Sequence, residues 1–124
     1  MIEYTVRVDD NGDRQWSLNG KTHREDGPAI EFYNGYKAWY INDKRHREDG
    51  PAIEYADGSK AWYIDDKRHR EDGPAVEFAD GDRSWYIDGV KLTKEQHKTK
   101  TTTVKDHTLQ EISELLGYNV RIVK

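Results

Sequence analysis

The sequence predicts a mostly β fold, an antiparallel array of β-hairpin repeats with a small helix and strand closing its C-terminal end. Three observations predict it. A segment of 23 residues recurs along the chain at a constant offset, apolar and polar residues alternate within each copy, and glycine-containing turn signals separate the alternating segments. A fixed period in this range is typical of repeat arrays, in which each copy buries its apolar face against its neighbours.

A tryptophan opens each copy, and the residues around it alternate with the period of a β-strand. In the second copy, Trp39 and Ile41 point to one side and Tyr40 to the other. Aromatic side chains bury roughly 150–250 Å² each, so a few of them can hold a thin sheet together. The predicted structural core of the repeats consists of Trp16, Trp39, Trp62 and Trp85 together with Ile41, Ile64 and Ile87.

Two sets of turns punctuate the array. The first set follows the tryptophan segment at 19–20, 42–43, 65–66 and 88–89, where Asn-Gly and Asp-Gly are strong tight-hairpin signals and Asn-Asp and Asp-Asp are weaker ones. The second set lies at Gly12, Gly35, Gly58 and Gly81. Between them, a Gly-Pro pair is expected to interrupt the strand, because proline cannot donate to a sheet ladder.

The array is expected to span residues 1–92, as a half repeat, three full repeats and a partial fourth that begins at Trp85. The first strand, at 2–9, carries Arg7 and Asp9 in positions that are apolar in later copies. It is therefore expected to cap the array, either by a register shift or by presenting an edge to solvent.

Residues 93–124 are expected to form a C-terminal capping segment. Thr93 and Gln96 have the spacing of a capping box that opens a short helical turn. The Lys- and Thr-rich segment 98–105 is expected to be extended or flexible, and is either a solvated linker or a contact for an acidic partner. A helix at 108–116 and a strand at 118–124 are expected to complete the segment and to pair the exposed sheet edge.

Composition excludes several classes of function. The 124 residues are 34% hydrophobic and 35% charged, with a formal net charge of -4. This charge disfavours nonspecific binding to nucleic acids or anionic membranes. The chain has no cysteine, so thiol catalysis, disulfides and cysteine-based zinc sites are excluded. No apolar run approaches the length of a membrane span, and a cytoplasmic location is expected.

The tetrapeptide His-Arg-Glu-Asp, which occurs three times, contains side chains that can bind metals or transfer protons. An active site, however, needs unlike groups that converge on one point. Equivalent residues of the array are expected to lie two strand spacings apart, roughly 9–10 Å, which is too far for them to share one ion. We therefore predict no catalytic residue, no metal site and no cofactor, and expect these side chains to hydrogen-bond turns and neighbouring repeats.

The tyrosines that alternate with the tryptophan face are the candidate partner-binding residues, because exposed tyrosine is favoured at protein interfaces. An alternative is that this face is half-buried and closed by sheet curvature or by the C-terminal helix. The glutamate on the strand that follows each Gly-Pro pair is also a candidate, which adds three residues. The candidate set is Tyr40, Tyr63, Tyr86, Glu31, Glu54 and Glu77.

An Asn-Gly-Lys-x-His turn followed by Asp-Gly and an aromatic residue, at a period of 23 residues over 6–92, resembles the MORN repeat family. It is most similar to the bacterial and phage variants of that family, which are built on Trp-Tyr-x-Asn-Gly-Lys-x-His-Arg-Glu-Asp-Gly-Pro-Ala. The resemblance implies a twisted antiparallel sheet used for protein contacts, associated in some bacterial members with toxin neutralisation, and no catalysis. The family's usual His-Gly-x-Gly is replaced here by His-Arg-Glu-Asp-Gly-Pro-Ala, so the lipid-binding roles of some eukaryotic members are not expected.

The leading functional hypothesis is a non-catalytic protein-protein interaction module. It would be an inhibitor or antitoxin-like protein, encoded by a phage or bacterium, that docks on a partner such as a host defence factor and blocks it. A self-associating scaffold that pairs through its sheet edges is the alternative, and a small metal-dependent hydrolase or nuclease is a third. DNA binding is disfavoured because the segment 108–117, which resembles the first helix of a helix-turn-helix, is not followed by a recognition helix.

Overall fold

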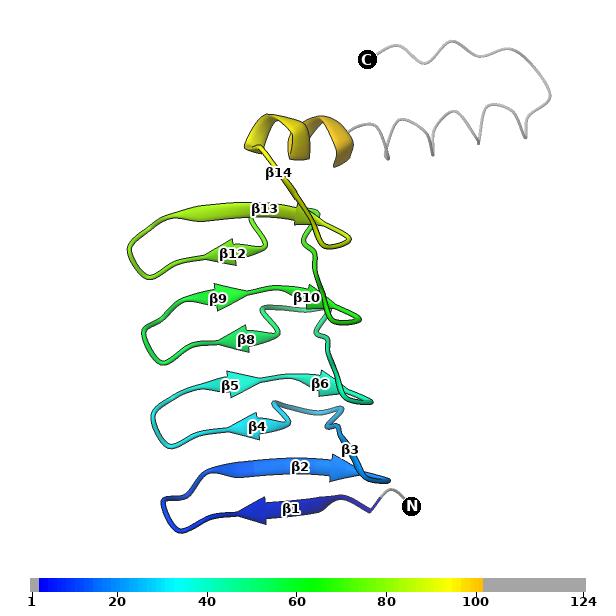
Figure 1. The fold of residues 1–124 in the computed structure, drawn as a ribbon, viewed down its shortest axis with the longest axis vertical. Coiled ribbons are helices and arrows are strands. Elements are labelled where there is room, and N and C mark those ends of the chain that lie inside the picture. The colour runs from blue at the N-terminus through cyan, green and yellow to red at the C-terminus, as the bar shows by residue number, and fades with distance from the viewer. Residues whose placement is uncertain (1–2, 102–124) are drawn as a thin grey trace, which may run out of the picture.

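The structure is a computed structural model that describes residues 3–101. It consists of short antiparallel strands and one helix at 94–101. Figure 1 shows the hairpins stacked one above another along the chain, with the helix over the C-terminal end of the stack. The strands are β1 (Thr5–Val8), β2 (Arg14–Leu18), β3 (Lys21–Thr22), β4 (Ile30–Glu31), β5 (Lys37–Ala38), β6 (Tyr40–Ile41), β7 (Lys44–Arg45), β8 (Ile53–Glu54), β9 (Lys60–Ala61), β10 (Tyr63–Ile64), β11 (Lys67–Arg68), β12 (Val76–Glu77), β13 (Arg83–Ile87) and β14 (Val90–Leu92).

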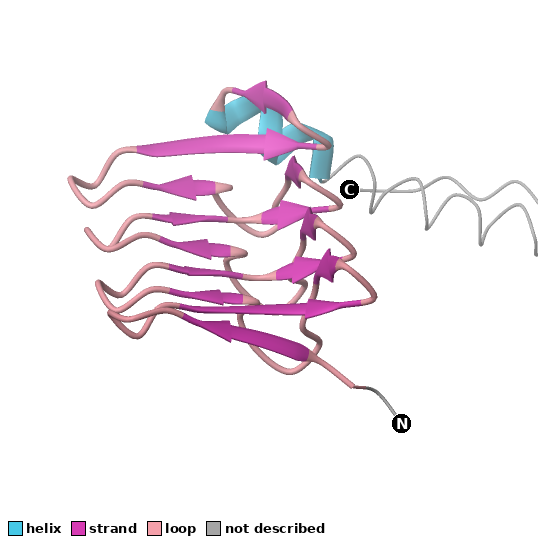
Figure 2. Ribbon diagram, turned by 60° about the horizontal axis from the view of Figure 1, so that its bottom comes forward, coloured by secondary structure: helices cyan, strands magenta, loops and turns pink. Residues whose placement is uncertain are grey.

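The strands form one long sheet and two small ones. The long sheet has the order β1-β2-β4-β5-β8-β9-β12-β13-β14, with β3 beside β2, and the small sheets pair β6 with β7 and β10 with β11. Figure 2 shows the small hairpins lined up along one side of the main ladder. Each full repeat therefore contributes a hairpin to the ladder and a second, smaller hairpin beside it. The predicted fold class, a mostly β array of antiparallel hairpins with a short helix, is confirmed.

The register of the ladder is the same in every repeat, and it places a branched residue beside an alanine at each step. Ile30 lies opposite Ala38, Ala38 opposite Ile53, Ile53 opposite Ala61, and Ala61 opposite Val76. These alternating residues belong to the tyrosine face, where the main hydrophobic cluster forms. The cluster consists of Ala38, Ala52, Ile53, Ala61, Tyr63 and Val76, with Ile30, Tyr36, Tyr40 and Tyr86 packed against it.

The tryptophans expected to form the repeat core lie outside this cluster. Trp16, Trp39, Trp62 and Trp85 are half-buried, as are Ile41 and Ile64, while Ile87 is buried. The difference has a steric cause. The alanines leave room for the tyrosine rings to lie against the sheet, and the guanidinium groups of Arg45 and Arg68 cover the Tyr63 ring at 4.2 and 5.9 Å. Tyr63 and the alanines beside it are therefore better protected from solvent than the tryptophans are.

The hairpin turns that follow the tryptophans have the backbone conformation that their sequences predict. Both central residues have positive φ in every case, with values of 49° and 69° at Asn42 and Asp43. This is the type I′ turn, in which glycine is usual at the second position. Asp43 replaces it at a conformational cost, and the structure shows a compensating contact, because the Thr22 N–H donates to Asp43 Oδ1 at 2.7 Å.

The N-terminal strand keeps the register of the repeats and presents an edge to solvent. Arg7 pairs with Gln15, one repeat before the pair Ile30 and Ala38. No register shift occurs, and all four residues of β1 are exposed. Of the two alternatives for this segment, the structure shows the solvent-facing edge.

The helix at 94–101 begins with the predicted capping box. The Gln96 N–H donates to Thr93 Oγ1 at 3.1 Å, and the Thr93 N–H donates to Gln96 Oε1 at 2.9 Å. The expectation of an extended or flexible segment from Lys98 onward is wrong for 98–101, which continue the helix. The rest of 98–105, the helix-turn-helix-like segment 108–117, the predicted helix at 108–116 and the predicted strand at 118–124 lie outside the described residues.

Candidate interaction surface

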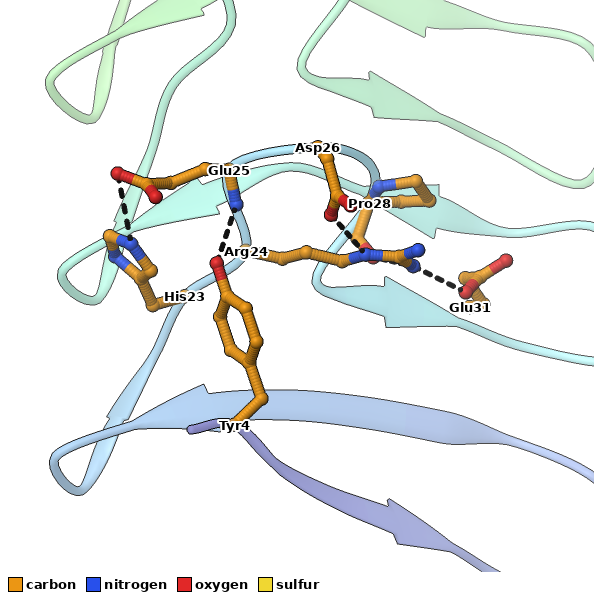
Figure 3. Close-up of polar contacts among 7 residues, drawn as sticks. All are labelled: Tyr4, His23, Arg24, Glu25, Asp26, Pro28 and Glu31. Atoms are coloured by element: carbon orange, nitrogen blue, oxygen red, sulfur yellow. Dashed lines mark hydrogen bonds and ion pairs between the residues drawn. The ribbon is translucent and has the colours of Figure 1, made fainter. Parts of the chain in front are cut away.

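The three loops that contain His-Arg-Glu-Asp-Gly-Pro (23–28, 46–51 and 69–74), called here the polar loops, are each organised around their arginine. In the first loop, Arg24 Nε donates to Asp26 Oδ1 at 3.0 Å, and Arg24 Nη1 donates to the Pro28 carbonyl at 3.2 Å and to Glu31 Oε1 at 3.1 Å (Figure 3). Its guanidinium also lies 3.8 Å from the centroid of the Trp16 ring. One side chain thus folds the loop, covers the tryptophan and joins the loop to the ladder.

The same contacts recur in the next two units. Arg47 bonds Asp49, the Pro51 carbonyl and Glu54, and lies 3.9 Å from the Trp39 centroid. In the third loop, Arg70 bonds Asp72, the Pro74 carbonyl and Glu77, and lies 3.9 Å from the Trp62 centroid.

The glycine of each polar loop is required by this arginine rather than by a turn. A Cβ added at Gly50 would lie 2.9 Å from Arg47 Cζ, and one added at Gly27 would lie 3.0 Å from Arg24 Cζ. These are closer than normal van der Waals contacts, and the guanidinium is held by its hydrogen bonds. The Gly-Pro pair therefore makes space for the arginine, in addition to ending the strand pairing.

The histidines accept hydrogen bonds from the next repeat. The backbone N–H of Asn42 donates to His23 Nδ1 at 3.0 Å, and that of Asp65 donates to His46 Nδ1 at 3.1 Å. The third copy repeats this between Asp88 and His69, at 3.0 Å. Each histidine therefore caps a turn of the following hairpin, so its ring is committed to a structural contact.

The candidate partner-binding residues occupy structural positions. Tyr63 is 4% exposed and belongs to the hydrophobic cluster, and Tyr40 and Tyr86 pack against it. Of the two alternatives for the tyrosine column, intramolecular packing describes its environment. Glu31, Glu54 and Glu77 are half-buried and accept hydrogen bonds from the arginines of the polar loops.

Two grooves lie on the tryptophan face between successive polar loops. Trp39 and Ile41 line one, the Trp39 groove, of about 810 Å³, and Trp62 and Ile64 line the other, the Trp62 groove, of about 840 Å³. The loops before and after each tryptophan form the walls, at 24–27 and 46–49 for the Trp39 groove and at 47–50 and 69–72 for the Trp62 groove. The sequence pattern did not indicate them, because it does not show that successive loops stand apart.

Tyr4 occupies the equivalent place beside the first tryptophan. Its ring centroid is 5.5 Å from that of Trp16 in an edge-on arrangement and 6.3 Å from that of His23 in a stacked one. The backbone N–H of Glu25 donates to the Tyr4 hydroxyl at 3.2 Å, as Figure 3 shows. The first position of the row is therefore filled by an aromatic ring of the chain itself.

The helix closes the last position of the row. His97 is 5% exposed, and its Nε2 lies 2.5 Å from the carbonyl oxygen of Arg70, in the loop that precedes Trp85. Figure 1 places this helix over the end of the ladder. The Trp39 and Trp62 grooves thus lie between the position that Tyr4 fills and the polar loop at 69–74, which the helix contacts through His97.

A second exposed feature lies at the hairpin turns of the ladder. Phe32, Tyr55 and Phe78 recur at the repeat period and are 41%, 39% and 47% exposed, and Tyr33 beside them is 74% exposed. Phe32 stacks on Tyr36 at 5.2 Å between ring centroids. Burial of Tyr36 raises its pKa above the usual value, as burial also does for Tyr55. These rings stabilise each other but remain open to solvent.

Within residues 3–101, no group of three or more histidine, aspartate or glutamate side chains has an arrangement that could hold a metal ion. In the same part of the chain, no helix is long and apolar enough to cross a membrane. Comparison of the chain with protein-family models, with curated proteins and with solved structures finds no match. Any functional proposal therefore has to be supported by the geometry of the surface itself.

Proposed function

We propose that this protein is a non-catalytic interaction module that binds a partner protein through the tryptophan face. The observation that carries the proposal is the pair of adjacent, open, aromatic-lined grooves, which lie between a position that the Tyr4 ring fills and a loop that the C-terminal helix contacts through His97. Aromatic surfaces bounded by charged groups are typical of protein-binding sites. A rigid hairpin array also keeps such sites in a fixed relative position, which lowers the entropy cost of binding.

The environment of the polar loops supports binding rather than chemistry. His46 accepts from a backbone N–H, and Arg47 is bonded to two carboxylates and a carbonyl. A general base or nucleophile needs a free reactive atom within reach of a substrate. If the protein were a hydrolase using these groups, His46→Ala would abolish an activity that the wild type shows, and that result would count against the proposal.

We infer further, from the resemblance of the repeats to bacterial and phage variants of the MORN family, that the bound partner is blocked, as by an antitoxin or an inhibitor of a host defence protein. Crosslinking in a bacterial lysate, with the wild type and a variant carrying Ile41→Arg and Ile64→Arg in the grooves, tests the proposal. Wild type should capture a partner that the folded variant does not. A matched variant, Tyr33→Ser on the hairpin turns, should capture it normally.

A second candidate is a scaffold that self-associates through its first strand. This candidate is favoured by the exposure of Val6 and Val8, at 39% and 58%, on the edge strand β1. Arg7 and Asp9 on the same segment oppose it, because charges on an edge strand discourage pairing with another sheet. Measurement of mass in solution separates the two, since a scaffold would grow with concentration in the micromolar range and a module of the proposed kind would remain monomeric.

A further inference from the structure

We propose that the Trp39 and Trp62 grooves each bind the unmodified phenol ring of a tyrosine from an extended, positively charged segment of a partner protein. This inference rests on the proposed function and adds the chemistry of the partner. Four observations support the inference: the way in which Tyr4 binds, the free hydrogen-bonding groups in the two open grooves, the charge of the grooves and the distance between them.

Tyr4 shows what this kind of groove accommodates. Its ring packs edge-on against Trp16, stacks on His23, and places its hydroxyl within 3.2 Å of the Glu25 backbone nitrogen. The Trp39 groove offers the equivalent groups in Trp39 and His46. A flat aromatic ring with a polar tip is therefore the side-chain shape that the architecture already binds.

The open grooves retain the polar groups that such a ring would use. Glu48 and Glu71 correspond to Glu25 one and two repeats on, and their backbone N–H groups have no hydrogen-bond partner within residues 3–101. The wall opposite each of these amides carries a backbone carbonyl, that of Arg24 in the Trp39 groove and that of Arg47 in the Trp62 groove. No described residue donates a hydrogen bond to either carbonyl. The equivalent carbonyl in the next repeat, that of Arg70, contacts His97. A phenol hydroxyl can accept and donate one hydrogen bond each, so it matches a wall that donates facing a wall that accepts.

The negative charge of the grooves favours an unphosphorylated tyrosine over a phosphotyrosine. Two arginines and four carboxylates line each groove, which gives a formal charge of -2. Each arginine is already paired with the aspartate of its own loop and with a glutamate of the ladder. A phosphate on the tyrosine would add a charge of about -2 facing these carboxylates, and would be repelled. Lysine or arginine beside the tyrosine would instead be attracted, which also accelerates association.

The spacing of the grooves indicates the conformation of the bound segment. One strand of the ladder, β8, lies between those that precede Trp39 and Trp62, so the two grooves are two strand spacings apart, roughly 9–10 Å. A polyproline II segment has three residues per turn and rises about 3.1 Å per residue, which places residues three apart on one face about 9.3 Å from each other. A Tyr-x-x-Tyr segment in this conformation would fill both grooves.

The test uses the full chain and a labelled synthetic peptide, Lys-Tyr-Pro-Pro-Tyr-Lys, with affinity measured by fluorescence anisotropy and contacts mapped by backbone NMR. We expect shifts at the Glu48 and Glu71 amides and a fluorescence change of the tryptophans. Replacing both tyrosines of the peptide by phenylalanine removes only the hydroxyls, with the two hydrogen bonds that each would make, and should weaken binding at least about 10-fold. Phosphorylation of both tyrosines should abolish binding, and replacing one of them by alanine should weaken it at least about tenfold, because the second ring binds at high effective concentration.

Five outcomes would overturn the inference. The alanine and tyrosine peptides could bind equally, or the phosphorylated peptide could bind best. The shifts could map to Phe32, Tyr55 and Phe78 on the other face. The peptide could bind only after Tyr118, outside the described residues, is replaced by serine, which would make the chain its own ligand. Finally, a dimer at micromolar concentration that the peptide dissociates would show that a second copy fills the grooves.

The proposed function and this inference fail separately. A crosslinked partner that is lost from the groove variant, together with no binding of the tyrosine peptide, would retain the interaction module and reject tyrosine as its ligand. A partner captured equally by wild type and by the Ile41→Arg, Ile64→Arg variant would reject the grooves altogether.

Discussion

At the scale of single residues, the arginine of each polar loop replaces the second layer that a sandwich would provide. Arg47 covers one side of Trp39 with its guanidinium plane and uses its N–H groups on the loop and the ladder. The Arg47 side chain is about three-quarters buried, at 23% exposure, whereas that of Asp49 is 87% exposed. Exposed ion pairs contribute little, so the stabilisation comes mainly from the stacking and from the hydrogen bond to the half-buried Pro51 carbonyl.

This arrangement predicts a coupling between Arg47 and Gly50. Gly50→Ala should destabilise the protein by about 1–3 kcal/mol, because the new methyl group displaces a guanidinium that is held by several hydrogen bonds. In an Arg47→Ala background the same substitution should cost almost nothing, since the space is then empty. Urea unfolding of the four proteins of this double-mutant cycle measures the coupling. Equal costs in both backgrounds would show that Gly50 is required by its backbone and not by the arginine.

Asp66 gives a prediction about pH. A hydrogen bond from Arg45 holds the Asp66 pKa below its ordinary value of 3.8. Since the pKa is lower in the folded state, the carboxylate adds stability above about pH 4 and loses it as pH falls through the folded value. Asp66 is 46% exposed, so the contribution should stay under about 1 kcal/mol.

Asp66→Asn keeps the side-chain oxygen and tolerates positive φ, so it isolates the charge. When the pH is lowered from 4 to 2, the free energy of unfolding of the variant should fall slightly less than that of the wild type. Urea titrations at fixed salt concentration measure both. Asp10→Asn, which changes an exposed carboxylate without a partner among residues 3–101, serves as the control. If the stability of Asp66→Asn fell as steeply with pH as that of the wild type, the Asp66 carboxylate would not have the stabilising role assigned to it.

At the scale of elements, the sequence predicts where hairpins turn and fails to predict which face is covered. Turn positions follow from local chemistry, because Asn-Gly, Asp-Gly and even Asp-Asp satisfy the positive φ values of the type I′ turn. Alternation shows that Trp39 and Tyr40 point to opposite faces. It does not show that the Tyr40 face is the better buried one, because this depends on the small Ala38 and Ala61 in neighbouring strands and on long arginine side chains that lie over the rings.

The grooves could not be predicted from the sequence for a related reason. A pattern with a period of 23 residues predicts equal units, whereas the grooves are defined by how far successive loops stand apart. Their closure at the ends depends on Tyr4 and His97, which belong to no repeated column. The role of His97 is visible only once the helix is placed against Arg70.

The helix provides the prediction at this scale. His97→Ala should undock the helix, because it removes a buried ring and its contact with the Arg70 carbonyl. We expect a loss of about 1–3 kcal/mol and faster amide exchange at 95–101, while the ladder keeps its protection. Lys98→Ala, an exposed neighbour, is the matched control. Equal protection of the helix amides in wild type and His97→Ala would show that other contacts hold it.

At the scale of the whole molecule, the side chains that cover the repeat array at its two ends differ from those in its middle. The sequence alone predicts that Trp62→Ala, in the middle, costs roughly 3–5 kcal/mol and more than Trp16→Ala at a frayed end. The structure removes the reason for the difference, since Tyr4 and Arg24 cover Trp16. We now expect Trp16→Ala to cost at least as much, measured by urea unfolding, and a markedly smaller cost would show that the N-terminal unit is frayed in solution.

If stability is a sum over units and their interfaces, one whole unit can be removed without loss of the fold. Deletion of 47–69 joins His46 to Arg70 and recreates the native His-Arg junction, so the shortened chain should unfold in a single transition with an m value smaller by roughly a fifth. Deletion of 47–57 should not fold, because it joins His46 to Gly58 and leaves Trp39 without its arginine. The whole-unit deletion also leaves one groove between the two closed ends. With a single groove, the shortened chain can hold only one tyrosine of the two-tyrosine peptide at a time. Its affinity for that peptide should therefore be no higher than the affinity of the full chain for a one-tyrosine peptide. This result would tie the number of repeats to the number of tyrosines bound.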